Sequence, residues 1–362
     1  METIVSTGPI HCHIEPTRRC NLNCIMCCPH ELRHAHRPDM GFDLFQKVVD
    51  DESFTKNLHT IGLYGNGEPL VSPAFMPMLT YLTTTPRLQH IHVNITTNGM
   101  LLDDMARKHF LGYNTSISVS FDGATKGTFE KIRKSSDFDR IVANLEAIRD
   151  LKARYRTLFP IVNFTFTAMR DNIEELPYVL NLAHCLEVKN VTCAYCVIQS
   201  PCIDPHQSLY FHKELSNAVF RKAFTIAQTL KINFYIPPLF GTTGPAVHKP
   251  WSTCPWVMRN SVIECDGKVV PCCMLTASMG NVGESTFEEV WNGEEYRELR
   301  RRLIQDDPPE KCRECPDMRS ANVDSISRHF TPEKQRELAG VDPAFRPREP
   351  AEILSPVNSC CP

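Results

Sequence analysis

Short apolar segments that alternate with helical stretches restrict the fold of this chain more than any other feature. Six such segments recur over the first two thirds of the sequence, at residues 10–15, 59–64, 90–96, 115–121, 161–168 and 190–198. Helical patterns lie between them, the clearest at residues 44–51, 137–154 and 173–185. This alternation is typical of βα units with parallel strands. Six units make roughly 190 residues, fewer than the eight units and about 250 residues of a closed barrel. We therefore expect an α/β fold with a partial (β/α)6 TIM-like barrel.

A second, smaller domain is expected after the barrel. A helix at residues 211–230 and a strand at residues 232–236 end the first region, and residues 241–250 are rich in glycine, proline and threonine, which favours a boundary there. Beyond it, the Asp266-Gly267 pair predicts a hairpin, and a charged helix is expected at residues 287–304. We expect a barrel domain at residues 1–240, a small α+β domain at residues 251–320 and an irregular tail at residues 331–362.

The composition is that of a globular chain without a nucleic-acid or membrane partner. Of 362 residues, 42% are hydrophobic, and 39 basic against 42 acidic side chains leave a formal charge of −3. This balance gives no basic field for nucleic acid or an anionic membrane. We find no secretory signal and no apolar run of about 18 residues, so we expect a cytoplasmic protein. In that compartment the 17 cysteines indicate metal ligands more than disulfides.

Three cysteines cluster directly after the first expected strand. Cys20, Cys24 and Cys27 share one loop, and three thiolates can hold a 4Fe-4S cube that keeps its fourth iron open. An open coordination position is where a substrate or cofactor binds a metal. The alternative is zinc, but a closed zinc site needs a fourth ligand, and Cys28 and His30 give poor tetrahedral spacing. We expect an iron–sulfur cluster, because thiolate-rich sites favour iron–sulfur or zinc over harder metals.

The cysteine loop resembles the signature of the radical S-adenosylmethionine (SAM) enzymes, and the resemblance extends over about residues 10–320. A Gly-Asn-Gly-Glu-Pro turn that begins at Gly65 is similar to the family motif for the SAM amino group. Family-like motifs also end the third and fourth strands, and a later arginine is similar to one that clamps the SAM carboxylate. The resemblance implies that a 4Fe-4S cluster on the three cysteines chelates SAM. It implies SAM-binding roles for Met26, Gly65, Gly67, Glu68, Asn98, Ser120 and Arg133.

Each of these positions also has a purely structural interpretation. Glycine and proline punctuate any strand end, Ser120 and Asp122 fit a turn-and-cap pair, and Arg133 fits a solvated charge on a helix. We favour ligand binding for Ser120 and Arg133, since an arginine suits bidentate binding of a carboxylate. The role of Asp122 stays open between ligand and cap, because short polar residues at turns often serve only the backbone.

A second group of cysteines lies beyond the expected boundary. It resembles the auxiliary-cluster extension of the same family, called SPASM or, in its shorter form, Twitch. The full extension needs further cysteines soon after Cys315, and this chain has none before Cys360. We therefore expect one auxiliary 4Fe-4S cluster on Cys254, Cys272, Cys312 and Cys315. A zinc ribbon with the same four thiolates is the alternative, and Cys273 can replace Cys272.

The remaining cysteines have no assigned ligand role, and most are expected to be buried filler, as for Cys185 on an apolar helix face. Cys193, Cys196 and Cys202 lie in or after the sixth strand, where barrel enzymes carry active-site residues. Cys193 and Cys196 have the spacing of a metal knuckle, but in a continuous strand they would point to opposite faces and could not chelate one ion. Our hypothesis is that one of these three thiols donates a hydrogen atom to a substrate radical. The vicinal pair Cys360-Cys361 could bind a soft metal or act as a redox pair, or belong to an inert terminus.

These features predict a radical SAM enzyme with two 4Fe-4S clusters and SAM as cofactors. A one-electron donor such as flavodoxin or ferredoxin would reduce the first cluster, and a 5′-deoxyadenosyl radical would abstract hydrogen from a small molecule, with oxidation or epimerisation as the outcome. Little chain precedes the first strand, so we favour a sugar, aminocyclitol or nucleoside of secondary metabolism over a peptide. A thiophilic (soft-element) or peptide substrate is the first alternative. A non-enzymatic iron–sulfur or zinc protein that transfers electrons or scaffolds partners is the second.

Overall fold

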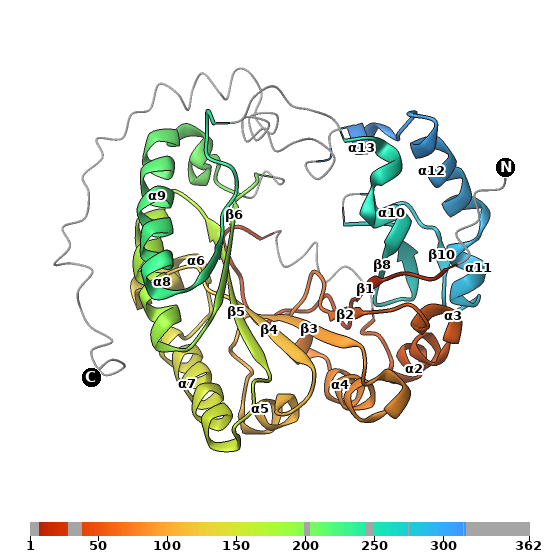
Figure 1. The fold of residues 1–362 in the computed structure, drawn as a ribbon, viewed down its shortest axis with the longest axis horizontal. Coiled ribbons are helices and arrows are strands. Elements are labelled where there is room, and N and C mark those ends of the chain that lie inside the picture. The colour runs from red at the N-terminus through yellow and green to blue at the C-terminus, as the bar shows by residue number, and fades with distance from the viewer. Residues whose placement is uncertain are drawn as a thin grey trace.

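A single curved sheet organises the computed structural model of this chain. The structure describes residues 7–27, 38–198, 203–242, 249–273, 275–313 and 315. Its ten strands follow the order β10-β9-β8-β1-β2-β3-β4-β5-β6-β7. In Figure 1 the strands form an open arc with helices around its outside, and the helix α9 lies at one end of the arc and α12 near the other. The predicted α/β partial barrel is confirmed.

The first seven strands are parallel and follow chain order, as sequential βα units require. The six predicted strands are present, and the segment near residue 234 joins them as a seventh parallel strand. The sixth strand ends at Tyr195, earlier than expected. These strands are β1 (His11–Ile14), β2 (Thr60–Leu63), β3 (His92–Thr97), β4 (Thr115–Ser120), β5 (Ile161–Ala168), β6 (Asn190–Tyr195) and β7 (Asn233–Tyr235).

Helices cover one face of these strands. The helix α7 begins after Asp137, whose carboxylate accepts a hydrogen bond from the Arg140 amide and so caps the helix. It buries Ile141, Leu145 and Ile148 on one stripe, as an amphipathic helix does. The helices of this region are α2 (Phe42–Asp50), α3 (Glu52–Thr55), α4 (Phe75–Thr84), α5 (Asp104–Phe110), α6 (Lys126–Ile132), α7 (Phe138–Tyr155), α8 (Leu176–Cys185) and α9 (Lys213–Leu230).

The two faces of the sheet differ in chemistry. On β5, for example, Phe164 and Phe166 are buried in the core, whereas Asn163, Thr165 and Thr167 between them are only partly buried. The other central strands repeat this alternation, since successive side chains of a strand point to opposite faces. The helix-covered face is therefore apolar and forms the core, and the opposite, inner face is polar.

The C-terminal cysteine region continues the same sheet. The strand β8 pairs in parallel with β1, and β9 returns antiparallel to β8 through the predicted hairpin, where Gly267 adopts φ +83°. The domain limits stay a prediction, and the sheet runs from one part into the other. The elements of this part are α10 (Pro255–Arg259), β8 (Asn260–Ile263), β9 (Lys268–Val270), β10 (Gly280–Asn281), α11 (Phe287–Trp291), α12 (Glu294–Ile304) and α13 (Glu310–Arg313).

The helix expected at residues 287–304 is two helices, so that prediction was wrong in one respect. The chain breaks between α11 and α12, where Gly293 is extended at φ −67° and ψ 170°. A Cβ atom on Gly293 would lie 2.8 Å from the Glu289 carbonyl oxygen, so glycine permits the sharp change of direction. The helical pattern continues on both sides, which is why the break is not visible in the periodicity.

Several expectations lie outside the described residues: Cys28 and His30, Cys202, most of the 241–250 boundary, and the tail at residues 331–362 with Cys360 and Cys361. Within the described ranges, none of the helices combines the length and the hydropathy that crossing a bilayer requires.

Candidate active site

The first cysteine loop is held at the carboxyl ends of the strands by backbone hydrogen bonds. The amides of Asn23 and Ile25 donate to carbonyl groups at the end of α6, over 3.0 and 2.9 Å. Cys20 and Cys24 are half-buried and Cys27 is exposed. Cys20 and Cys27 both lie near enough to raise the pKa of the Cys24 thiol. The structure therefore places Cys20 and Cys27, two of the three predicted cluster ligands, near the third, Cys24.

Arg133 connects this loop to the end of β4. It caps the C-terminal end of α6, and its Nη2 atom lies 2.6 Å from Oδ2 of Asp122, in an ion pair that is almost fully buried. Its Nη1 atom lies 3.8 Å from the Cys24 sulfur. Burial raises the pKa of Cys24 to about 11, and the guanidinium opposes that rise by favouring the thiolate. Arg133 is thus a buried cation beside a cluster ligand and not a solvated helix charge.

The Asp122–Arg133 pair shows that an anionic group fits at this place. Asp122, whose role the sequence left open, also accepts a 2.6 Å hydrogen bond from the Thr167 amide. The buried Nε atom of Arg133 has no hydrogen-bond partner within the described part of the chain. A buried donor normally has an acceptor, and a cluster with thiolate ligands or the carboxylate of SAM would supply one here. The SAM contact of Arg133 itself stays a prediction.

The glycine-rich turn after β2 packs directly on the cysteine loop. A Cβ atom on Gly67 would lie 2.5 Å from the Thr17 carbonyl oxygen and 2.6 Å from that of Arg19. The Glu68 amide donates to the same Arg19 carbonyl over 2.8 Å. A Cβ atom on Gly65 would be 2.4 Å from Cγ of Glu15. These glycines allow two loops of the protein to pack closely together. From the sequence, the same glycines were expected to let the backbone approach SAM.

Replacing Gly67 by alanine is expected to displace the cysteine loop, because the new Cβ atom would collide with backbone atoms that cannot rotate away. We expect the reconstituted G67A variant to bind SAM at least about tenfold more weakly, the equivalent of ~1.4 kcal/mol, as measured by equilibrium dialysis. Gly127→Ala is the matched control, because no atom lies within 4 Å of its Cβ position. Equal weakening in both variants would show that the tight contact is unimportant.

Glu68 and Asn98 tie the ends of β2 and β3 together. The Glu68 carboxylate accepts hydrogen bonds from Oγ1 of Thr97 and the amide of Asn98, both at 2.7 Å, and from the amide of Leu70 at 3.3 Å. Burial raises its pKa to about 7, against the effect of these donors. The Asn98 side chain donates to Oδ1 of Asn21 in the cysteine loop over 2.8 Å. Both residues thus position the loops, and their predicted SAM contacts stay predictions.

Met26 and Ser120 occupy places compatible with their predicted roles. Met26 is half-buried and packs against the core next to the cluster cysteines. Ser120 ends β4 on the inner face, half-buried, with its Oγ atom 3.5 Å from that of Thr165. Contacts of either residue with the adenosine part of SAM stay predictions.

The two described cysteines of strand six are buried. Cys193 follows the alternation of Val191 and Tyr195, which face the helix-covered side, and Cys196 comes just after the strand end. Burial raises both thiol pKa values, that of Cys196 to about 12, and Asp122 adds to both shifts. Both groups therefore stay protonated thiols near Asp122, and their role as hydrogen donors stays a hypothesis.

The auxiliary cysteines partly converge. Burial raises the pKa of Cys312 to about 11, and Cys254 and Cys315 lie near enough to raise it further. Cys272 lies near Tyr296 and Cys273 near Tyr64, so these neighbours point to different sides. In the described ranges, no three His, Cys, Asp or Glu side chains stand close enough together to hold a single metal ion. A cubane distributes its thiolates over several iron atoms and needs wider spacing.

A charged network that sequence reasoning missed joins the two cysteine regions. Arg18 lies 2.8 Å from the carboxylate of Glu15 and 2.7 Å from that of Glu264 at the end of β8. Glu15 also accepts a 2.8 Å hydrogen bond from the Asn66 amide in the glycine-rich turn. The only local signal was a glutamate at the end of an apolar strand. This network couples the position of the glycine-rich turn to that of the auxiliary hairpin.

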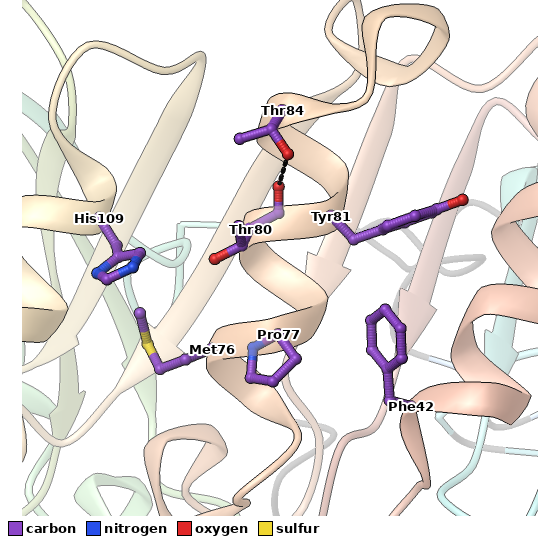
Figure 2. A pocket seen from close by; sticks show the side chains of 7 residues that line it. All are labelled: Phe42, Met76, Pro77, Thr80, Tyr81, Thr84 and His109. Carbon is purple, nitrogen blue, oxygen red and sulfur yellow. Dashed lines mark hydrogen bonds between the residues drawn. The ribbon is translucent and has the colours of Figure 1, made fainter.

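A pocket of about 440 Å³ lies elsewhere, on the helix side of the sheet. Figure 2 shows it between α2, α4 and α5, where Phe42 and Tyr81 flank one end and Met76 and His109 the other. The drawn hydrogen bond, from Thr84 to the Thr80 carbonyl over 2.7 Å, belongs to the helix itself. This pocket contains no predicted ligand of a cluster or of SAM, so it is not the candidate active site.

Comparisons with known proteins agree with the arrangement of the two cysteine regions. The radical SAM superfamily model matches residues 14–183, and the model of the SPASM iron–sulfur cluster-binding domain matches residues 254–316. The chain is 27% identical over 315 residues to the tungsten-containing aldehyde ferredoxin oxidoreductase cofactor-modifying protein of Pyrococcus furiosus, covering 78% of this chain and 81% of that protein.

Solved structures share the fold. Streptococcus suis SuiB bound to S-adenosylmethionine aligns with a TM-score of 0.65 at 15% identity, covering 83% of this chain and 69% of SuiB. Native anSMEcpe with bound AdoMet aligns with a TM-score of 0.62 at 16% identity, and the alignment covers 92% of this chain and 100% of the anSMEcpe chain.

The chain belongs to the radical SAM enzymes and carries a SPASM domain. The predicted cofactors are confirmed at the level of the family: SAM, a SAM-binding 4Fe-4S cluster and an auxiliary 4Fe-4S cluster. The thiolate-rich sites fit such anionic groups, and so does the Nε atom of Arg133, which has no hydrogen-bond partner among the described residues. Cys20, Cys24 and Cys27 remain the proposed ligands of the first cluster, and Cys254, Cys272, Cys312 and Cys315 those of the second.

Proposed function

We propose that this enzyme abstracts a hydrogen atom from a small, uncharged, hydroxyl-bearing molecule such as a sugar, aminocyclitol or nucleoside, with oxidation as the outcome. The observation that carries the proposal is the inner face of the sheet. Its partly exposed side chains near the carboxyl ends of the strands form what we call the polar wall: Thr96, Ser118, Ser120, Thr165, Thr167 and Thr192.

The polar wall is uncharged along its whole described extent. Between β3 and β7, the inner-face positions of the described strands carry serine, threonine, asparagine, histidine, tyrosine, alanine and isoleucine and no Asp, Glu, Lys or Arg. Toward the amino-terminal ends of β5, β6 and β7, Asn163, Asn190 and Asn233 bond to one another in a row, over 2.7 and 2.9 Å. Hydroxyl and amide groups both donate and accept, which suits substrate hydroxyls. A phosphate or carboxylate would favour arginine or lysine instead.

Reductive cleavage of SAM to methionine and a 5′-deoxyadenosyl radical is the chemistry that the cofactors supply when bound. The chain contributes position and environment. Arg133 places a positive charge beside Cys24, and the polar wall would orient one substrate C–H bond toward the radical. A one-electron donor such as flavodoxin or ferredoxin completes the scheme.

The substrate class can be tested with deuterated compounds. Reconstituted enzyme with SAM and dithionite is incubated with perdeuterated glucose, myo-inositol and adenosine, each beside its phosphate ester. We expect deuterium to enter 5′-deoxyadenosine from a neutral compound. Transfer from the phosphate esters alone, or from none of the neutral compounds, would contradict the proposal.

The polar wall makes a separate prediction. We measure KM for whichever neutral compound transfers deuterium. For that substrate we expect Thr165→Val to raise KM about fivefold to tenfold, because one hydrogen bond contributes roughly 1–1.5 kcal/mol. The matched control is Thr225→Val on the exposed side of α9, which should leave KM unchanged. Equal KM values in both variants would show that the polar wall does not contact the substrate.

A further inference from the structure

His13 and Tyr64 form a hydrogen-bonded pair on the inner face that none of the roles above uses. The Tyr64 hydroxyl lies 2.9 Å from Nε2 of His13, and the two ring centroids are 4.7 Å apart. His13 is in β1 and Tyr64 directly follows β2, and both are half-buried. The pair therefore stands at the carboxyl ends of the first two strands.

A glycine inside β2 makes room for this pair. A Cβ atom on Gly62 would lie 2.6 Å from Cε1 of Tyr64 and 3.0 Å from Cδ2 of His13. Glycine weakens a strand interior and often marks the close approach of another group. Here the groups that approach Gly62 are the rings of Tyr64 and His13. A larger residue at position 62 would collide with both rings.

The protonation states show that both partners of this hydrogen bond are neutral at neutral pH. Burial raises the pKa of Tyr64 to about 12, so its hydroxyl keeps the proton and is able both to donate and to accept a hydrogen bond. Burial, with a smaller effect from His11, lowers the pKa of His13 to about 4, so the imidazole is neutral. A neutral imidazole has one donor and one acceptor nitrogen. Of the two tautomers of His13, the one with Nε2 as the acceptor and the proton on Nδ1 is the one that lets Tyr64 donate to His13.

The pair lies between the two cofactor regions. Tyr64 directly precedes Gly65 of the glycine-rich turn. On the other side, the His13 ring lies 5.4 Å from that of Trp256 in an edge-to-face arrangement, and Trp256 is two residues after Cys254. The pair thus stands between the glycine-rich turn and the segment that carries Cys254.

We propose that Tyr64 and His13 accept the proton that a substrate hydroxyl loses when its carbon is oxidised. The inference rests on the proposed function and assigns it a base. Removal of the C–H hydrogen atom by the deoxyadenosyl radical leaves a hydroxyl-bearing carbon radical. That radical must lose one electron and one proton to become a carbonyl compound. An auxiliary 4Fe-4S cluster held by the C-terminal cysteines would supply the one-electron acceptor.

The proton follows the hydrogen bond. The substrate hydroxyl gives its proton to Oη of Tyr64, and the Tyr64 proton moves to Nε2 of His13, which becomes imidazolium and later returns the proton to solvent. A weak base is sufficient, because a carbonyl that still carries this proton is a strong acid. A base with a low pKa also stays unprotonated and ready at neutral pH.

The test compares Tyr64→Phe and His13→Gln with the wild type, and Tyr81→Phe is the matched control. Tyr81 bonds to Asp50 on the helix side of the sheet. Perdeuterated glucose, myo-inositol and adenosine are the probes, and the ratio of carbonyl product to deuterated 5′-deoxyadenosine is measured. We expect this ratio to fall at least tenfold in both test variants and to stay unchanged in the control.

A second readout needs no turnover. In protein with 15N-labelled histidine, we expect the wild-type His13 signals to show a proton on Nδ1 and a hydrogen-bonded Nε2, with assignment from the H13Q spectrum. Tyr64→Phe should shift the Nε2 signal. A proton on Nε2 in the wild type would overturn the proposal.

The remaining outcomes separate the inference from the function beneath it. If Y64F and H13Q keep the wild-type product ratio, or if the wild type transfers deuterium but forms an epimer without a carbonyl, the inference fails and hydrogen abstraction stands. If SAM cleavage disappears in both variants, the pair supports SAM binding, and the inference also fails. If the wild type takes deuterium from none of the three probes, both proposals fail.

Discussion

Cys24→Ala will abolish formation of 5′-deoxyadenosine from SAM, the largest effect expected for a single substitution in this chain. Cys24 is the middle proposed ligand of the first cluster and the one in contact with Arg133. Without its thiolate the cluster is not held, and the iron content should fall from about eight to about four atoms per chain. Iron and sulfide analysis and chromatographic detection of 5′-deoxyadenosine measure the two effects.

Cys185→Ala is the control for this experiment. Cys185 is half-buried at the end of α8 and belongs to neither proposed ligand set, so its variant should keep full iron content and SAM cleavage. If C24A still formed 5′-deoxyadenosine, Cys24 would not be a ligand of the first cluster.

Arg133→Met will lower the free energy of unfolding of the apo chain by ~3–5 kcal/mol, because it leaves a buried charge without a partner. The Asp122 side chain that remains is fully buried. The double variant R133M/D122L should recover most of this loss, since it leaves no unpaired charge. Urea denaturation under anaerobic conditions measures all three proteins.

A surface ion pair provides the matched comparison for Arg133. Lys131 lies 2.8 Å from Asp171, and the lysine side chain is 60% exposed. Lys131→Met should therefore change the free energy of unfolding by less than ~1 kcal/mol. Equal losses in K131M and R133M, or no recovery in the double variant, would contradict the view that the buried pair is held by charge compensation.

Local patterns made the strands and the cysteine loops predictable. Strand alternation in segments such as Ile161–Ala168 depends on neighbouring residues only, and three cysteines within one loop are close in space whatever the rest of the chain does. The hairpin at Gly267 was predictable for the same reason, because its positive φ is a property of the turn. The break at Gly293 was not, because the helical pattern continues on both sides.

The roles of the buried charges depended on contacts between distant segments. Arg133 had the sequence context of a surface helix residue, and only the approach of Asp122 and Cys24 makes it a buried cation. Glu68 was expected to face SAM, and in the structure its oxygens bond to Thr97, Asn98 and Leu70. No local pattern separates these roles, because a charged side chain at a loop can turn either to a ligand or to a neighbouring loop.

The sequence by itself determined the kind of chemistry: thiolates at two sites, a SAM-type motif and a row of parallel strands. These depend on residue type and short spacing, which a chain carries before it folds. The tertiary structure decided which groups meet. It paired β8 with β1, placed Arg133 beside Cys24, and brought His13 to Tyr64 over the space that Gly62 provides. These contacts join residues that are dozens to hundreds of positions apart in the sequence. They form only when the folded sheet brings the distant segments together.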